Sequence, residues 1–445
     1  MRYFGTDGVR GVANRDLSPE LAFRLGLAAG TVFKDRGIAD AVLIGRDTRL
    51  SGHMLQGALT AGFCSAGVNV FDGGVLTTPA VAYLAAAMGR CVGVVVSASH
   101  NTAEDNGVKF FGCEGYKLDD ETLEAVEALI DDKPGSEDRP GGNGLGWAKP
   151  FPDGTTRYID HLVASIGVRL DGLKIVVDCA NGAASDLGPQ ALRQAGAQVI
   201  AIHDQPDGWN INRDCGSTHL ASLQEAVQKW DAQAGIAFDG DADRLLAVDH
   251  TGKVVDGDQI MVIFALHLRQ LGKLKGPVVV TVMSNLGLKE AFAEAGIDVL
   301  ETQVGDRFVL QEMLETGAVL GGEQSGHIIL LDASVTGDGI LTALQLLSVM
   351  KETGKPLAEL ASQMERFPQV LVNTPVGTKE GWDADPVIAE AIREAEDVLA
   401  GRGRLLVRPS GTEQLIRVMA EGPDAAVLQD LAEKLAAIIR DRQNR

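Results

Sequence analysis

The feature that most constrains this chain is a repeated alternation of short apolar segments with amphipathic ones, from about residue 17 onward. Residues 17–34 carry Ser18 as a helix N-cap, Pro19 at the first helical position and apolar residues at helical spacing. The strand "AVLIG" (41–45), a helix over 51–66 and the strand "VNVF" follow. This βαβ alternation predicts α/β domains with mostly parallel sheets that are covered on both faces.

Changes in composition divide the chain, which is too long for one hydrophobic core, into four predicted domains. The Gly- and Pro-rich segment 133–154 is predicted to be a linker or a long loop, and the alternation restarts after it. After Phe367-Pro368, an alternating strand and helices at about 384–400 and 424–441 predict a smaller α+β domain. The predicted domains are residues 1–152, 153–255, 256–367 and 368–445.

Charge and composition exclude several classes of partner. A formal charge of −21 and an aromatic content of 5% argue against binding to nucleic acid or an anionic membrane. The five cysteines are scattered without C-x-x-C spacing, so their spacing predicts neither a disulfide framework nor a zinc site. The N-terminus lacks the apolar core of a signal peptide, and no apolar run reaches the length of a membrane span. We therefore expect a reduced, soluble, cytoplasmic protein.

The stretch "VSASHN" (96–101) places two serines, a histidine and an asparagine directly after an apolar strand. Open α/β sheets bind ligands at the carboxyl ends of their strands. Ser99 lacks the G-x-S-x-G frame of a hydrolase. Adjacent His100 is not expected to act as its base, because neighbouring side chains diverge along an extended chain. The residues alone leave two interpretations open, a structural turn, which is slightly favoured, and a nucleophile.

A second polar stretch, "FDGDADRL" (238–245), carries three alternating carboxylates, Asp239, Asp241 and Asp243. In an extended loop these side chains would project to one side, and a hard cation would be needed to offset their repulsion. An EF-hand is excluded, because Arg244 and His250 stand where that loop needs Gly and Glu. The pattern predicts a Mg²⁺ site shared with a phosphate that Arg244 contacts; a solvated acidic loop is the alternative.

Glu323, Ser325 and His327 alternate in "GGEQSGHIIL" (321–330), just before an apolar strand. A carboxylate, a hydroxyl and an imidazole on one face suit the binding of sugar hydroxyls and proton transfer. An ordinary surface strand is the alternative interpretation.

The stretch "RPSGTEQLIRV" (408–418) combines arginines with a Gly-containing turn. Guanidinium groups and exposed backbone N–H groups bind phosphate, although the P-loop frame is absent. The predicted anion-binding set is Arg408, Ser410, Gly411, Thr412 and Arg417, and a plain turn with incidental arginines is the alternative.

Five motifs, "FGTDGVRG", "SASHN", "DGDADR", "GEQSGH" and "RPSGTE", occur in this order over the full length of the chain. In these motifs the chain resembles the α-D-phosphohexomutases. The resemblance implies three α/β domains of similar topology and a smaller α+β domain, arranged around a central cleft. Gln324 resembles the branch that acts on glucosamine, which implies interconversion of glucosamine 6-phosphate and glucosamine 1-phosphate for UDP-N-acetylglucosamine and cell-wall synthesis. A phosphomannomutase or phosphoglucomutase on the same scaffold is the nearest alternative.

Two rivals from other classes also remain at this point. One is an aspartyl-nucleophile phosphatase that uses Asp239 or Asp241, although such enzymes usually place that pair after the first strand. The other is a non-catalytic sensor of sugar phosphates. The presence of a nucleophile together with a metal-binding set argues against the sensor.

The resemblance also assigns roles to individual residues. It implies that Ser99 carries a phosphoryl group and joins Asp239, Asp241 and Asp243 as ligands of one Mg²⁺. Lys109 and His327 are the implied acid/base candidates, and the implied phosphoryl contacts are Arg10, His100 and Arg244. Glu323, Ser325 and the loop Gly305-Asp306-Arg307 would select and bind the sugar. The phosphate that is not transferred would be held by Arg408, Ser410, Gly411, Thr412 and Arg417.

The resemblance implies partners and departures as well. The implied partners are small sugar phosphates, a catalytic sugar 1,6-bisphosphate primer, an activating kinase or self-phosphorylation at Ser99, and a second copy of the chain in a homodimer. Thr102 and Gln414 stand where the family often carries proline, which predicts looser loops at these two positions.

Overall fold

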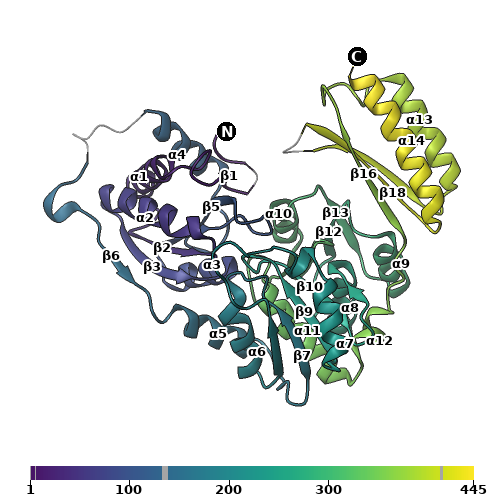
Figure 1. Ribbon diagram of the computed structural model, residues 1–445, viewed down its shortest axis with the longest axis horizontal. Coiled ribbons are helices and arrows are strands. Elements are labelled where there is room, and N and C mark those ends of the chain that lie inside the picture. The colour runs from purple at the N-terminus through teal and green to yellow at the C-terminus, as the bar shows by residue number, and fades with distance from the viewer. Residues whose placement is uncertain (1, 6, 133–138, 411–413, 445) are drawn as a thin grey trace. The chain divides into compact units, whose positions relative to one another are not determined.

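The structure is a computed structural model that describes all residues except 1, 6, 133–138, 411–413 and 445. Helices and strands alternate along the described chain (Figure 1). Contacts divide the chain into two compact units, Met1–Met283 with Asp298–Gln363, and Ser284–Ile297 with Met364–Arg445. Among the described residues, no helix is long and apolar enough to cross a membrane.

The first sheet has the strand order β1-β5-β4-β2-β3-β6. Strands β4, β2, β3 and β6 run parallel, and β5 and β1 add an antiparallel edge. The strands are β1 (Val9–Val12), β2 (Ala41–Arg46), β3 (Asn69–Val75), β4 (Cys91–Val96), β5 (Asp105–Phe111) and β6 (Ala148–Pro150). Within the predicted linker or long loop 133–154, of which 133–138 lie outside the described residues, β6 pairs with the edge strand β3 and satisfies its open backbone groups.

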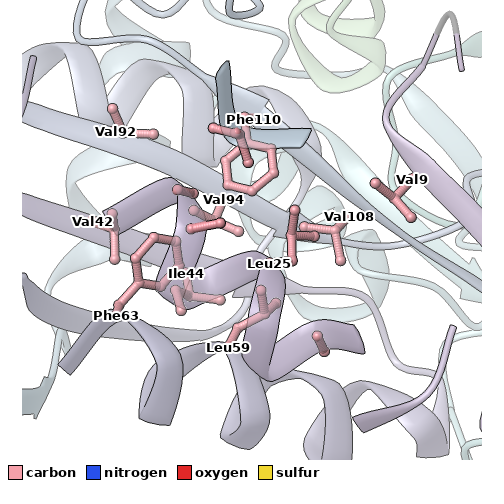
Figure 2. Packing of buried hydrophobic residues seen from close by; sticks show 14 of the residues in the cluster. Val9, Leu25, Val42, Ile44, Leu59, Phe63, Val92, Val94, Val108 and Phe110 are labelled. Atoms are coloured by element: carbon pink, nitrogen blue, oxygen red, sulfur yellow. The ribbon is translucent and has the colours of Figure 1, made fainter. Parts of the chain in front are cut away.

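Helices α1 (Pro19–Asp35) and α2 (Leu50–Ser65) pack together on this sheet, next to α4 (Asp120–Asp132). Ser18 caps α1 by accepting a hydrogen bond from the N–H of Leu21, as the sequence predicts. The two helices approach closely, since a Cβ on Gly62 would lie 2.3 Å from the carbonyl oxygen of Phe23. Leu25, Leu59 and Phe63 of these helices pack against valines of the sheet (Figure 2). Helix α3 (Thr78–Ala87) contacts β4 and β2.

The second and third sheets of the first unit are also mixed. The second has the order β11-β10-β9-β7-β8 and the third β13-β12-β14-β15. The strands of the second sheet are β7 (Lys174–Asp178), β8 (Gln198–Ile202), β9 (Ala234–Phe238), β10 (Leu245–Asp249) and β11 (Val254–Val255), and the helices in the same part of the chain are α5 (Gly154–Ala164), α6 (Ala184–Gln194) and α7 (Ala221–Lys229). The strands of the third sheet are β12 (Val278–Thr281), β13 (Val299–Thr302), β14 (Leu320–Gly322) and β15 (Ile328–Leu330), and the helices in the same part of the chain are α8 (Gly257–Gln270), α10 (Asp306–Thr316), α11 (Gly339–Thr353) and α12 (Leu357–Ala361).

The second unit is a smaller α+β structure. Its antiparallel sheet has the order β16-β18-β17, and helices α13 and α14 lie side by side along one face of it (Figure 1). Its elements are α9 (Leu286–Ala295), β16 (Gln369–Pro375), α13 (Pro386–Leu399), β17 (Arg404–Pro409), β18 (Leu415–Glu421) and α14 (Ala425–Gln443). The predicted fold class, three similar α/β domains and a smaller C-terminal α+β domain, is confirmed.

Candidate active site

Ser99 lies in the turn that follows β4, at the carboxyl edge of the first sheet. Its side chain is buried, and its backbone has a left-handed conformation with a φ of +50°. The hydroxyl of Ser99 donates to Oδ2 of Asp239 across 2.6 Å. Left-handed backbone at a non-glycine residue is strained, and such positions gather at functional sites. The turn thus holds Ser99 toward the aspartate loop between β9 and β10.

Arg49 anchors the turn that carries Ser99. The Arg49 side chain is fully buried, and its Nη2 donates to the carbonyls of Ser99 (3.1 Å) and Asn101 (2.8 Å). Its Nη1 donates to the carbonyl of Thr102, and its Nε donates to Asp47 at 2.8 Å. A buried guanidinium needs many partners to offset the loss of water. The turn is therefore anchored at Thr102 without the proline that the resembled family often carries there.

The position of His100 corrects an expectation that was based on strand geometry. Neighbouring side chains would diverge in an extended chain, but Nδ1 of His100 lies 3.4 Å from Oγ of Ser99. The left-handed backbone of Ser99 turns the chain, so the two side chains meet. Burial, and then Arg244 and Arg10, lower the pKa of His100 to about 4. The imidazole is therefore neutral at pH 7 and can accept a hydrogen bond beside the hydroxyl.

The three predicted carboxylates converge in the turn between β9 and β10. Asp239, Asp241 and Asp243 are buried, and one oxygen from each lies within 4.8 Å of the others. The expected extended loop is wrong, because the chain turns here and Ala242 has a φ of +56°. The carboxylates meet because of this turn and not because of strand alternation. We call these three residues the aspartate cage.

The aspartate cage fits a metal ion. Oδ1 of Asp241 and Oδ1 of Asp243 are buried and have no hydrogen-bond partner among the described residues. Burial, followed by Asp243 and Asp241, raises the pKa of Asp239 well above its usual value. Buried acceptors without donors and mutually repelling carboxylates are what a bound cation relieves. A set of oxygen ligands alone suits a hard cation of the Mg²⁺ type.

Lys109 lies in β5 and points into the aspartate cage. The antiparallel register with β4 places it opposite Val95, four residues before Ser99. Its Nζ lies 3.0 Å from Oδ2 of Asp241 and 3.7 Å from Oδ2 of Asp243. Burial alone would lower the pKa of Lys109, but the nearby carboxylates together raise it above its usual value. Lys109 therefore stays protonated, in a position to stabilise negative charge at the cage.

Arg244 directly follows Asp243 of the aspartate cage and places hydrogen-bond donors beside it. Its backbone N–H donates to Oδ1 of Asp239 at 3.3 Å, and its Nε lies 3.8 Å from Oδ1 of Asp243. That Nε is buried and makes no hydrogen bond to any residue that the structure describes. A guanidinium with an unused donor beside a metal cage is suited to a phosphoryl oxygen. The phosphoryl contact of Arg244 stays a prediction.

Glu323, Ser325 and His327 lie in the tight turn between β14 and β15. The expected alternation along a strand is wrong, since Gly326 has a φ of +92° and reverses the chain. The hydroxyl of Ser325 lies 3.4 Å from Oε2 of Glu323, and Oε1 of Glu323 accepts the N–H of Gly305 at 3.1 Å. The turn thus brings together two of the predicted sugar-binding segments.

His327 is buried between two carboxylates. Its Nδ1 lies 3.7 Å from Oδ2 of Asp243, and its Nε2 lies 3.8 Å from Oδ2 of Asp306. The N–H of Gly337 donates to Nε2 at 3.1 Å, so the neutral ring carries its proton on Nδ1. Burial opposes protonation, but Asp243 and Asp306 raise the pKa of His327 above its usual value. A histidine in this setting suits proton transfer.

Asp7 and Lys117, which the sequence analysis did not single out, connect His327 to Lys109. Nζ of Lys117 lies 2.7 Å from Oδ1 of Asp7 and 2.6 Å from Oδ2 of Asp306. Oδ2 of Asp7 lies 3.2 Å from Nζ of Lys109. The result is a closed charge ring in which basic side chains alternate with carboxylates: Lys109, Asp7, Lys117, Asp306, His327 and Asp243.

Two arginines of the predicted site have partners on the first domain. Arg10 forms an ion pair with Asp7 and so borders the charge ring. Both terminal nitrogens of Arg307 bind the carboxylate of Asp120, at 2.6 and 2.7 Å, at the start of α4. The structure therefore gathers Arg10 and Asp306 near the cage, whereas it engages Arg307 with α4.

The predicted anion-binding set belongs to the second unit. Arg408 in β17 and Arg417 in β18 stand directly opposite each other in the antiparallel register. Directly opposed side chains of neighbouring strands lie on the same face of a sheet, so the two arginines share one face. Ser410 follows β17 and is buried. Gly411 and Thr412 lie outside the described residues.

Asp47, Arg49 and Asn212 are further contributors that the sequence analysis missed. Nδ2 of Asn212 donates to the carbonyls of Ser99 and Asn101, at 2.8 Å each. A signal for the first two was present, because "GRDTR" (45–49) follows the strand at 41–45 and so lies at the same sheet edge as Ser99. No local pattern marks Asn212, which reaches the turn from 111 residues away.

The chain matches all four domains of one family. Residues 1–135, 156–252 and 256–367 match the alpha/beta/alpha domains I, II and III of the family described as phosphoglucomutase/phosphomannomutase, and residues 371–438 match its C-terminal domain. Among curated relatives, the phosphoglucosamine mutase of Desulforamulus reducens is 57% identical over 439 residues, which are 98% of this chain and 99% of the relative. The phosphoglucosamine mutase of Pelotomaculum thermopropionicum is 56% identical over 98% and 99%.

Solved structures agree with this match. A phosphoglucomutase/phosphomannomutase family protein from Burkholderia thailandensis has a TM-score of 0.82 and 26% identity, over 99% of this chain and 98% of that one. The Aspergillus fumigatus N-acetylphosphoglucosamine mutase, solved with GlcNAc-6P and magnesium, has a TM-score of 0.72 and 19% identity over 99% and 96%, a likeness of fold alone. On the family match and the curated relatives together, the chain belongs to the phosphoglucomutase/phosphomannomutase family.

Proposed function

We propose that the protein interconverts glucosamine 6-phosphate and glucosamine 1-phosphate through phosphorylated Ser99 and a 1,6-bisphosphate intermediate. The observation that carries the proposal is the hydroxyl of Ser99, which lies 2.6 Å from Asp239 of the aspartate cage with Lys109 and Arg244 beside that cage. The amino sugar is supported by relatives named phosphoglucosamine mutase that are more than half identical over nearly the whole chain.

The proposed reaction consists of two phosphoryl transfers. In the first, O1 of glucosamine 6-phosphate attacks the phosphorus of phospho-Ser99, the bond from phosphorus to Oγ breaks, a base takes the proton of the sugar hydroxyl, and Oγ takes up a proton as it leaves. In the second, Oγ of Ser99 gives up its proton and attacks the 6-phosphoryl group of the reoriented bisphosphate, the bond from phosphorus to O6 breaks, and O6 takes up a proton as glucosamine 1-phosphate is released. The enzyme ends in the phosphorylated state in which it began. His327 is the proposed acid/base, because neighbouring carboxylates favour its protonation.

Cations around Ser99 are proposed to stabilise the moving phosphoryl group. Phosphoryl transfer depends on positioning and on neutralisation of negative charge more than on covalent chemistry. Lys109, Arg244 and Arg10 would supply fixed positive charge, and His100 would accept a hydrogen bond beside Oγ. Mg²⁺, held by the aspartate cage and Ser99, would supply further neutralisation when bound.

The remaining residues are proposed to recognise the substrate. Glu323, Ser325 and the loop Gly305-Asp306-Arg307 would bind the sugar hydroxyls, since Glu323 already contacts that loop. The non-transferred phosphate is assigned to Arg408, Ser410, Gly411, Thr412 and Arg417. We further propose a sugar 1,6-bisphosphate as primer, phosphorylation of Ser99 by a kinase or by the protein itself as the activating step, a homodimer, and action in the cytoplasm.

The domain boundaries also belong to the proposal. They place the phosphoserine loop in a domain of residues 1–152 and the metal-binding loop in a domain of residues 153–255. The sugar-binding loop lies in residues 256–367 and the phosphate-binding loop in residues 368–445. Family matches that end or begin near three of these boundaries support the division.

Turnover of Ser99→Ala tests the proposal. The assay couples formation of glucosamine 1-phosphate to a detectable product, with Mg²⁺ and a catalytic amount of the 1,6-bisphosphate. We expect no turnover in Ser99→Ala and normal turnover in Ser362→Ala, an exposed serine that hydrogen-bonds within its own helix end. Circular dichroism checks that both variants fold. Near-normal turnover of Ser99→Ala would contradict the proposed mechanism.

A phosphomannomutase or phosphoglucomutase activity is the second candidate function. It is favoured by the family description and by the likeness to the Burkholderia thailandensis protein. Comparison of kcat/KM for the 6-phosphates of glucosamine, mannose and glucose separates the two. Mass spectrometry that places a stable phosphate on Ser99, and not on an aspartate of the cage, distinguishes both mutases from an aspartyl phosphatase.

A further inference from the structure

A second group of metal-ligating side chains lies outside the aspartate cage, at the carboxyl ends of β7 and β8. Asp178 ends β7, His203 follows β8, and Cys215 lies just before the short turn at Gly216–Thr218. One ligand atom of each side chain lies within 4.8 Å of the other two. The carboxyl edge of a sheet is where α/β domains place their ligands. None of these three residues has a role in the proposed phosphoryl transfer.

The group contains buried polar atoms whose only close polar contact is with each other. Asp178 is fully buried, and its Oδ1 accepts the N–H of Ala180 at 2.9 Å. Its Oδ2 lies 3.0 Å from Nδ1 of His203, a contact that raises the pKa of His203, and neither atom has a further hydrogen-bond partner among the described residues. Buried carboxylate oxygens are normally satisfied. An oxygen and a nitrogen that face one space, next to a thiol, are arranged as ligands are around a cation.

The ligand chemistry selects the kind of metal. We propose that Asp178, His203 and Cys215 form a second metal site, specific for a borderline-soft divalent cation of the Zn²⁺ type. Thiolate, imidazole and carboxylate together are typical zinc ligands, whereas Mg²⁺ prefers oxygen alone. Three protein ligands leave a fourth position for water. The sequence did not predict this site, because its ligands come from three separate segments and not from closely spaced cysteines.

Binding of the metal is coupled to loss of a proton. A metal binds cysteine as the thiolate, so a bond from sulfur to metal forms, the bond from sulfur to hydrogen breaks, and the proton of Cys215 passes to solvent. The side chain of His203 is 31% exposed, which gives the metal a route from solvent.

The site bears on Ser99 through the loop that carries Cys215. Asn212, three residues before Cys215, donates to the carbonyls of Ser99 and Asn101 at 2.8 Å each. Its own N–H donates to the carbonyl of Ala180, two residues after Asp178. A metal that joins Asp178 to Cys215 would therefore brace the loop that supports the Ser99 turn.

Titration of the metal-free full-length chain with Co²⁺ tests the site. Co²⁺ occupies zinc sites, and its bond to a thiolate absorbs in the near ultraviolet, whereas binding to the aspartate cage gives no such band. We expect one equivalent of Co²⁺ to produce the band and Zn²⁺ to abolish it by displacement. Cys215→Ser and His203→Ala should each lose the band. Cys179→Ser is the matched control, a buried cysteine one residue after Asp178, and should keep it.

A second measurement guards against variants that fail to fold. His203 is part-exposed, so His203→Ala is expected to keep the far-ultraviolet circular dichroism of the parent. Zn²⁺ should raise the thermal midpoint of Asp239→Asn, whose cage is impaired, but not that of the double variant Asp239→Asn/His203→Ala. Absence of the thiolate band, or a band that persists in Cys215→Ser, would show that the three residues form only an ion pair beside a buried thiol and would overturn the proposal.

Discussion

Lys117 provides a direct test of the charge ring, because it is the cation between Asp7 and Asp306. Substitution to methionine keeps the length and apolar stem of the side chain but removes its charge. Two carboxylates would then face each other with no cation between them. We expect the loop Gly305-Asp306-Arg307 to lose its position beside Asp7, with a decrease in turnover although Lys117 is not assigned to contact substrate.

The expected magnitude follows from the contacts of Lys117. It makes two charge-assisted hydrogen bonds, at 2.7 and 2.6 Å. Each contributes about 1.5–3 kcal/mol. The side chains of Lys117, Asp7 and Asp306 are 22%, 29% and 24% exposed, so solvent screening reduces the sum of the two contributions. We expect Lys117→Met to lose about 3 kcal/mol of the interaction free energy that holds the loop in its active position. At about 1.4 kcal/mol for each factor of ten, this is a decrease of roughly 100-fold in kcat/KM.

The assay measures kcat and KM of Lys117→Met with glucosamine 6-phosphate. Lys117→Arg should recover most of the activity, since it restores the cation. Lys355→Met is the matched control, because it removes an exposed pair with Glu359 that contributes about 0.3–0.5 kcal/mol. In an Asp7→Asn background, the same methionine substitution should cost less, because one of its carboxylate partners is gone.

Two results would refute this reasoning about the charge ring. One is a kcat/KM for Lys117→Met within about threefold of the parent. The other is full additivity of Lys117→Met with Asp7→Asn, which would show that the two side chains are not energetically coupled.

Three further predictions concern the second unit, a buried carboxylate and the metal. Arg417→Ala should raise KM by the equivalent of roughly 1.5–3 kcal/mol, and an unchanged KM would place the phosphate contact elsewhere. Burial raises the pKa of Asp338 to about 6, so the folded state binds one more proton than the unfolded chain between about pH 4 and 6, and stability falls as pH rises through that window. Relative to the parent, the unfolding free energy of Asp338→Asn should therefore rise by up to about 3 kcal/mol from pH 4 to pH 7. A difference between the two proteins that does not change with pH would contradict this. Removal of Mg²⁺ by a chelator should lower the thermal midpoint of the parent but not of Asp239→Asn, and equal shifts would argue against the aspartate cage as the metal site.

Much of the fold could be predicted from local patterns. The alternation of apolar strands and amphipathic helices predicted α/β domains, and Ser18 with Pro19 marked the start of α1 within a residue. The segment 133–154 was predicted less well, because pairing of β6 with β3 depends on an edge strand that is distant in the sequence. Local composition indicates where turn-forming residues lie, but it does not indicate that β3 has an unpaired edge to which a distant segment can add a strand.

The candidate site shows the same division. Residue types and motifs singled out Ser99, the three aspartates and His327, but the assumed extended geometry was wrong in three loops. Left-handed backbone at Ser99, Ala242 and Gly326 turns each loop, and this is what brings the side chains together.

The sequence by itself determined the fold class, the order of the motifs and the chemical groups available for phosphoryl transfer. Only the tertiary structure decided which groups meet. Lys117 contacts Asp306 across 189 residues and Ser99 contacts Asp239 across 140 residues. The physical reason is that periodicity and capping act over a few residues, whereas ion pairs, burial and pKa shifts depend on groups that packing brings together from distant segments.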